Sequence, residues 1–325
     1  MKQFRLIIFI VLVFAIISGS LYFWSDNLTD LLVKGDRRVV LVMKTTERIS
    51  EFWIILEKGA IQAGEDLGIS VEVTGPDLEE NIEQQIYLMD EIIASNPDAI
   101  ILAATDYYRL VPVAEKAVDE GIPLLMVDSF IDSSESLCNI GTDNIAAGRK
   151  LGRYMKTFLH PGDEVAVISF VRDSSSAIDR EKGFLAEIGS LYRVYDTIYT
   201  NNNIETGYQA TLNILEEHPD IRGLVALNEN SALGTYRALK DSGLQDRIVF
   251  MTFDSDLELI HGLEEEIIDA TLVQKPYNMG YLSVKNAFSL IEGKTVHRNI
   301  DTGSELITKQ NMYNIRNQKL LFPSH

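Results

Sequence analysis

The feature that most constrains the fold of this chain is an alternation of short apolar runs with segments whose apolar residues recur at helical spacing. The apolar run Val39–Met43 is followed by a segment that places Leu56, Ala60 and Ala63 on one helical face, and Gly68 ends that segment. Short, wholly apolar strands that alternate with helices are typical of parallel sheets covered on both faces. The body of the chain is therefore predicted to be an α/β protein.

The alternation restarts after Gly141, which indicates two lobes rather than one long sheet. The expected strands cover 39–43, 69–73, 99–103 and 123–127 in the first lobe, and 165–170, 193–199, 223–227, 248–253 and 270–273 in the second. The clearest helical segments are 52–67, 144–159, 256–265 and 277–292. The predicted fold class is two doubly wound, Rossmann-like parallel-sheet lobes that follow an N-terminal transmembrane helix.

Residues 1–24 contain the candidate membrane segment. Basic residues precede an uncharged run of 19 residues from Leu6 to Trp24, and acidic residues follow it. At about 1.5 Å per residue this run crosses a hydrocarbon core of about 30 Å, and the charge bias places the N-terminus inside. Ser18 and Ser20 fit the alternative, a cleaved signal peptide, whereas the aromatic cluster Tyr22–Trp24 fits the outer interface of an uncleaved anchor.

Composition excludes several classes of function. There are 29 basic and 48 acidic residues, and this net charge of −19 argues against nucleic acid as a partner. A single cysteine, Cys138, allows no internal disulfide, and the five histidines lack metal-ligand spacing. No nucleophile elbow, phosphate loop or dinucleotide fingerprint occurs. No catalytic residue, metal or cofactor is predicted, although counting carboxylates alone does not exclude a glycosidase pair.

Polar residues follow several of the expected strands, where parallel open sheets bind their ligands. A polar loop is the alternative explanation at any single strand end, but seven such ends together favour a ligand site. These ends are 44–47, 104–106, 128–129, 172–176, 228–229, 254–255 and 274.

Residues 38–310 resemble the pentose/hexose-type periplasmic binding proteins, the group that includes ribose-binding protein. The matching segments, in order, are FWIILEKGA (52–60), IPLLMVD (122–128), GTDNIAAG (141–148), DREKGF (179–184), HPDIRGLVALNENSALG (218–234), MTFD (251–254) and ATLVQKPYNMG (270–280). The lactose-repressor group shares the fold, but a membrane segment is predicted here in place of its DNA-binding headpiece.

The resemblance implies two lobes that are joined by three hinge crossovers and close around a ligand. The crossovers are expected near 129–142, near 254 and near 275. The resulting domain prediction is an anchor or signal segment (1–24), a linker (25–35), an N-terminal lobe (36–142 plus 275–303) and a C-terminal lobe (143–274 plus 304–317).

The resemblance also implies a set of ligand-binding residues. Phe52 and Trp53 are expected to supply an aromatic wall for the sugar faces, with burial in the core as the alternative. The positions that carry hydroxyl-binding residues in the family are held here by Asp128, Arg180, Asn228, Asp254 and Gln274.

Simpler roles remain open for some of these residues. Asp128 and Asp254 are alternatively helix N-caps. Arg180 alternatively pairs with a carboxylate beside it on a solvated helix. Asn230 and the serine after it are interpreted as a helix start rather than as part of the site.

Three positions depart from the ribose-type pattern. Lys44 stands where a small polar residue is usual, and it either faces the cleft and favours an acidic or phosphorylated ligand or pairs with a nearby carboxylate. Ser129 replaces an arginine, and Asn202 falls near where an aromatic ring of the second lobe would stack. These departures argue against ribose itself as the ligand.

The sequence therefore predicts an extracytoplasmic solute-binding protein that captures a sugar or polyol and delivers it to the permease of an ABC importer. It would be anchored to the cell membrane by its N-terminal helix, or released to the periplasm if that helix is cleaved. The alternative is a subunit that presents bound sugar to a membrane histidine kinase. An extracytoplasmic enzyme acting on carbohydrate is a third possibility.

Overall fold

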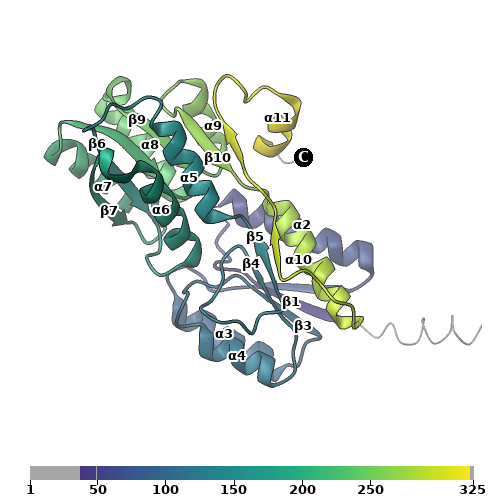
Figure 1. Ribbon diagram of the computed structural model, residues 1–325. Helices are drawn as coiled ribbons and strands as arrows, with labels where there is room; N and C mark the ends of the chain where they lie inside the picture. Colours follow the sequence, from purple (N-terminus) through teal and green to yellow (C-terminus); the bar gives the residue numbers. More distant parts are fainter. Residues whose placement is uncertain (1–36, 49, 323–325) are drawn as a thin grey trace, which may run out of the picture. The chain divides into compact units, whose positions relative to one another are not determined.

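The computed structural model describes residues 37–48 and 50–322 (Figure 1). The predicted membrane segment and the linker after it lie outside the described residues. Within the described part of the chain, no helix is both long enough and apolar enough to cross a membrane. From Arg38 onward the chain forms one compact unit that contains two sheets.

The first sheet has six strands in the order β11-β5-β4-β3-β1-β2, and all of its strand pairs are parallel. Helices α2 and α10 cover one face of this sheet, and α3 and α4 cover the other (Figure 1). Its elements are β1 (Arg38–Val42), α2 (Glu51–Leu67), β2 (Ser70–Thr74), α3 (Ile82–Ala94), β3 (Ala99–Leu102), α4 (Val111–Asp119), β4 (Leu124–Val127), β5 (Cys138–Gly141), α10 (Pro276–Ile291) and β11 (Asn299–Asp301).

Strand β1 shows why the apolar runs are continuous. Val39 and Leu41 belong to the core beneath α2 and α10, whereas Val40 and Val42 belong to the core beneath α3 and α4. Side chains alternate between the two faces of a strand, so a strand that is buried on both faces needs an apolar residue at every position.

The second sheet also has six strands, in the order β12-β10-β9-β8-β6-β7. Its pairs are parallel except that β12 lies antiparallel to β10 at the edge. Its elements are α5 (Asn144–Met155), β6 (Glu164–Ser169), α6 (Ser175–Ile188), η1 (Gly189–Leu191), β7 (Arg193–Tyr199), α7 (Ile204–Glu217), β8 (Ile221–Ala226), α8 (Glu229–Ser242), η2 (Gln245–Arg247), β9 (Val249–Phe253), α9 (Leu257–Glu264), β10 (Ala270–Val273), β12 (Glu305–Ile307) and α11 (Ile315–Leu321).

The two α/β lobes with parallel sheets confirm this part of the predicted fold class. The chain passes between the sheets after β5, after β10 and between β11 and β12. The crossover predicted near residue 254 is wrong, because β9 and β10 on either side of it pair with each other in the second sheet. The third passage lies at residues 302–304 instead.

Candidate functional site

A cavity between the lobes is lined by nine of the ten residues predicted to bind ligand. The tenth, Ser129, lies beside it and donates a hydrogen bond from Oγ to Asp128 Oδ2 at 2.9 Å. The space in this cavity that can hold the centres of water-sized molecules is about 40 Å³. Its walls consist of Lys44, Ser50, Phe52, Trp53, Glu79, Asp128, Phe170, Ser176, Arg180, Asn202, Asn228, Glu229, Asn230, Asp254 and Gln274.

Asp128 and Asp254 occupy corresponding places in the two lobes, directly after β4 and β9. Both have left-handed backbones, with φ of 61° and 68°. Non-glycine residues adopt this conformation rarely, and it often marks functional sites. Neither residue caps a helix, since α9 is capped by Asp256 and Asp128 is followed by a strand. The N-cap alternative therefore does not hold.

Arg180 and Asp254 form the polar centre of the second-lobe wall. The guanidinium donates to Asn144 Oδ1 at 2.9 Å and to the Leu227 carbonyl at 2.8 Å, and its Nη1 lies 3.8 Å from Asp254 Oδ2. Gln274 Nε2 donates to Asp254 Oδ1 at 2.6 Å. Burial raises the pKa of the Asp254 carboxyl, and Arg180 acts in the opposite direction. Arg180 is thus buried in the cavity wall rather than paired on a solvated helix.

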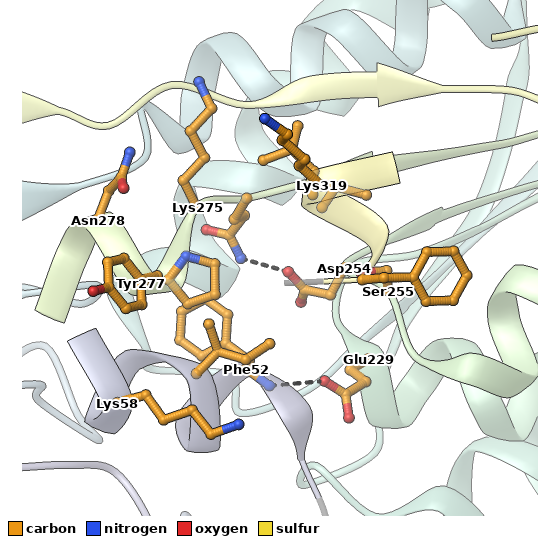
Figure 2. Close-up of a pocket in the computed structure, with 15 residues that line it drawn as sticks. Phe52, Lys58, Glu229, Asp254, Ser255, Lys275, Tyr277, Asn278 and Lys319 are labelled. Carbon is orange, nitrogen blue, oxygen red and sulfur yellow. Dashed lines mark hydrogen bonds between the residues drawn. The ribbon is translucent and has the colours of Figure 1, made fainter. Parts of the chain in front are cut away.

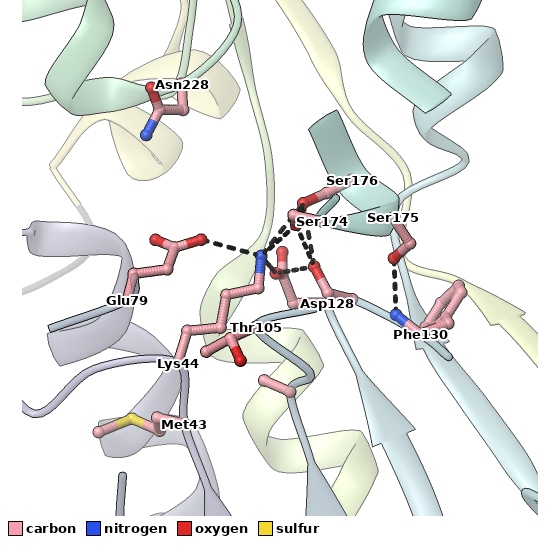
Figure 3. Close-up of polar contacts among 12 residues, drawn as sticks. Met43, Lys44, Glu79, Thr105, Asp128, Phe130, Ser174, Ser175, Ser176 and Asn228 are labelled. Carbon is pink, nitrogen blue, oxygen red and sulfur yellow. Dashed lines mark hydrogen bonds and ion pairs between the residues drawn. The ribbon is translucent and has the colours of Figure 1, made fainter. Parts of the chain in front are cut away.

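Lys44 is the centre of a buried charge cluster that joins the lobes (Figure 3). Its Nζ donates to the second-lobe hydroxyls of Ser174 and Ser176 at 2.8 and 3.2 Å. It also lies 3.2 Å from Glu79 Oε1 and 3.4 Å from Asp128 Oδ2. The carboxylate-paired alternative for Lys44 therefore holds, and the ammonium is not free to neutralise an anionic ligand.

Glu229, at the start of α8, connects the second lobe to helix α2 of the first lobe. Its carboxylate accepts from the backbone N–H of Glu51 at 3.1 Å and of Phe52 at 3.4 Å, and from Ser50 Oγ at 3.1 Å. The N-terminus of a helix favours a carboxylate because its first N–H groups lack partners. Burial acts against that charge and raises the pKa of Glu229 to about 8.

Aromatic rings enter the cavity from both lobes. Phe52 and Trp53 meet edge to face, with ring centroids 5.0 Å apart, and both also belong to the first-lobe core. The cavity and the core interpretations of these two rings therefore both apply. On the second lobe the ring is Phe170, which directly follows β6 and is almost fully buried.

The asparagines of the second lobe are divided between structural bonds and the cavity. Asn228 Oδ1 accepts from the Ser231 N–H as the N-cap of α8, while its Nδ2 donates to Asn202 Oδ1 at 2.6 Å. Asn202 Nδ2 in turn donates across the lobes to Glu79 Oε2 at 2.8 Å. Asn230 lies in the first turn of α8, as the sequence predicts, and it also lines the cavity.

Ser176 and Glu229 belong to strand ends that the sequence indicates as ligand-binding, and Asn230 was assigned to a helix start, whereas the cavity residues Ser50, Glu79 and Phe170 were not predicted. Glu79 lies in the loop that follows β2. It stands five residues beyond the end of the strand, too far for the strand end to predict its position. Phe170 continues an apolar run, and nothing local distinguishes it from a core residue.

A second cavity adjoins the first (Figure 2). The two cavities share four residues, which form two hydrogen-bonded pairs, Asp254 with Gln274 and Glu229 with Phe52. The walls of the second cavity are mainly apolar and include three lysines. Its remaining residues are Ile55, Lys58, Ser255, Val273, Lys275, Pro276, Tyr277, Asn278, Lys319, Leu320 and Phe322. The first cavity has the denser set of paired hydrogen-bonding groups, so it is the better candidate for a polyhydroxylated ligand.

Comparison with known proteins gives consistent relatives. The D-ribose/D-allose-binding protein of Pseudomonas aeruginosa is 27% identical over 284 residues, which cover 83% of this chain and 88% of that protein. The structure is similar to a carbohydrate transporter solute binding protein of Agrobacterium radiobacter in complex with D-arabinose, with a TM-score of 0.84 and 28% identity over 89% of this chain and 99% of the other. It is also similar to a sugar transporter of Clostridium phytofermentans, with a TM-score of 0.79 and 35% identity. That match covers 83% of this chain and 98% of the other.

A family model for the periplasmic binding protein domain matches residues 39–295, which is most of the chain. This match covers every residue that lines the first cavity and the strands of both sheets, except for β11, β12 and the first residue of β1. The chain therefore belongs to the periplasmic binding protein family, and within it to the ribose/galactose type.

Proposed function

We propose that this protein captures a sugar between its two lobes and delivers it to an ABC importer. The observation that carries the proposal is the single cavity lined by nine of the ten residues selected from the sequence. A sugar presents hydroxyl groups around its rim and C–H groups on its faces. Carboxylate, amide and guanidinium groups match the rim, and aromatic rings match the faces. Both kinds of group line this cavity.

The ligand class that the relatives support is a pentose or a hexose. The relatives are named for binding D-ribose and D-allose, and one was solved with D-arabinose. They are binding and transport proteins, and this chain acts as a binding protein rather than as an enzyme. Its family operates outside the cytoplasm, which places the two lobes on that side of the membrane.

Closure of the lobes is the step that converts binding into a signal for the importer. Lys44, Glu79 and Glu229 already form hydrogen bonds or ion contacts from one lobe to the other. A ligand that bonds to both lobes adds to these contacts and stabilises the closed arrangement. Such domain closure is a standard switching motion.

The test is a binding screen on the full chain in detergent, with D-ribose, D-allose, D-arabinose, D-galactose and myo-inositol. A ligand at about 100 times its Kd stabilises the folded state by about 2.7 kcal/mol. For a protein of this size that raises the Tm by about 4 °C. A rise with at least one sugar, matched by a calorimetric titration, supports the proposal. No rise with any of the panel at millimolar concentration contradicts it.

The predicted uncleaved helix within 1–24 adds a membrane anchor to this proposal. An anchored receptor suits a second role, in which the closed lobes present the sugar to a membrane histidine kinase. Co-purification from crosslinked membranes separates the two roles. Recovery of an ABC permease supports import, whereas recovery of a kinase without a permease supports sensing.

A further inference from the structure

The unused hydrogen-bonding capacity of the ligand cavity is concentrated on Glu79. Glu79 is 6% exposed and reaches the cavity from the loop between β2 and α3. Its Oε2 accepts from Asn202, but its Oε1 has no hydrogen bond and only the ion contact with Lys44. Lys44 balances the charge of this oxygen, and a carboxylate oxygen can accept more than one hydrogen bond, so Oε1 retains capacity for a further donor.

A second vacant acceptor lines the same cavity. Asn230 Oδ1 is buried without a hydrogen bond, whereas its Nδ2 already donates to the Asn202 carbonyl at 2.9 Å. Lys44 is committed, because it serves two serines and two carboxylates, whereas Arg180 bonds to Asn144, Leu227 and Asp254 through its Nε and Nη1. Around Lys44 and Glu79 the cavity thus offers a ligand acceptors.

The charges around the cavity also favour a neutral ligand that donates hydrogen bonds. Its lining residues include four carboxyl groups, on Glu79, Asp128, Glu229 and Asp254, and two cations, Lys44 and Arg180. Because the pKa of Glu229 is raised to about 8, the excess of negative charge is greatest at pH 8 and above. A negatively charged ligand would bring acceptors to acceptors and would add a like charge to a carboxylate excess inside a buried site. Placing like charges next to each other is energetically costly, so this arrangement discriminates against an anionic ligand.

We infer that Glu79 contacts the bound ligand directly, takes a hydrogen bond from one of its hydroxyl groups and excludes sugars that carry a carboxylate or a phosphate. The inference rests on the proposed sugar-binding function and names the residue that selects among sugars. It replaces the expectation that Lys44 favours an anionic ligand. Glu79 also spans the lobes through Asn202, so its bond to the ligand forms only when the lobes are closed.

The experiment is calorimetric titration of the full chain at pH 8 with neutral and acidic sugars in pairs. The pairs are D-galactose with D-galacturonate, D-glucose with D-glucuronate, D-ribose with D-ribonate and D-arabinose with D-arabinonate. In every pair that binds, the neutral sugar is expected to bind at least tenfold more tightly. Glu79→Gln is expected to weaken the affinity for the neutral sugar at least tenfold. It is also expected to reduce the difference in affinity between the neutral sugar and its acid.

Glu80→Gln is the matched control, since Glu80 is the next residue and is exposed. An acid that binds as tightly as its neutral partner overturns the inference and leaves the sugar-binding function standing. So does a Glu79→Gln variant whose affinity for the neutral sugar stays within twofold of the control. Absence of binding to these eight compounds and to D-allose and myo-inositol overturns the sugar-binding function itself. The comparison within each pair needs no variant and so does not depend on how Glu79→Gln folds.

Discussion

Replacement of Lys44 by methionine is expected to open the lobes. Methionine keeps most of the length of the side chain but removes the ammonium that bonds to Ser174 and Ser176 and balances Glu79 and Asp128. Removing one partner from a buried ion pair costs about 3–5 kcal/mol while the other partner stays buried. Opening the lobes admits water to the two carboxylates and relieves this cost. The penalty is therefore expressed as a shift toward the open state rather than as unfolding.

The size of the shift follows from the same figures. At about 1.4 kcal/mol per factor of ten, the closed population falls by about two to three and a half orders of magnitude relative to the open one. The apparent Kd for the sugar found in the screen rises by a similar factor, because binding must first restore the closed arrangement.

Spin labels in the two lobes measure this closure. Exposed positions are available at Glu91 on α3 and Glu216 on α7, and the native Cys138 is fully buried and does not compete for label. With sugar at about ten times the wild-type Kd, the wild type is expected to show the short, closed distance and Lys44→Met the long one. The control is Lys58→Met, an exposed lysine on α2. A Lys44→Met protein that closes as the control does, with a Kd within threefold of it, refutes this reasoning.

Three further predictions concern the cavity and the anchor. Asp128→Ala and Asp254→Ala should each abolish sugar-dependent thermal stabilisation while circular dichroism stays that of the wild type, and unimpaired binding in both would show that the site is misplaced. Burial raises the pKa of Glu229 to about 8. An acid whose pKa is raised on closure takes up a proton, so sugar affinity should rise as pH falls from about 8 toward 5, and Glu229→Gln should flatten that slope; an unchanged pH profile would count against it. The full chain should remain in membranes washed at alkaline pH and retain residues 1–24 by mass, whereas a mature protein that starts after Ser20 would show cleavage.

The sequence predicts the central strands well because these strands are buried on both faces. Each such strand needs a continuous apolar run, and β1, β3 and β4 each have one. The edge strands β11 and β12 have three residues each, with polar residues among them. Their pairing depends on neighbours distant in sequence, so no local pattern predicts them.

The residues of the candidate site also divide into those that local sequence predicts and those that depend on distant parts of the chain. Asp128, Asp254 and Gln274 stand directly after strands, and the position of a strand end can be inferred from its apolar run. Glu79 lies five residues beyond β2, in a loop whose path depends on the rest of the fold. Its partner Asn202 comes from the other lobe, and a contact between lobes leaves no trace in local sequence. The pairing of Lys44 was open for the same reason.

The account depends most on where the sugar lies. A crystal structure of the full chain with the tightest neutral sugar from the screen tests it directly. The sugar ring is expected between Phe52 and Trp53 of the first lobe and Phe170 of the second, with hydroxyl groups on Asp254 and Glu79. A sugar bound instead in the second cavity, against Tyr277 and Lys319, would contradict the account.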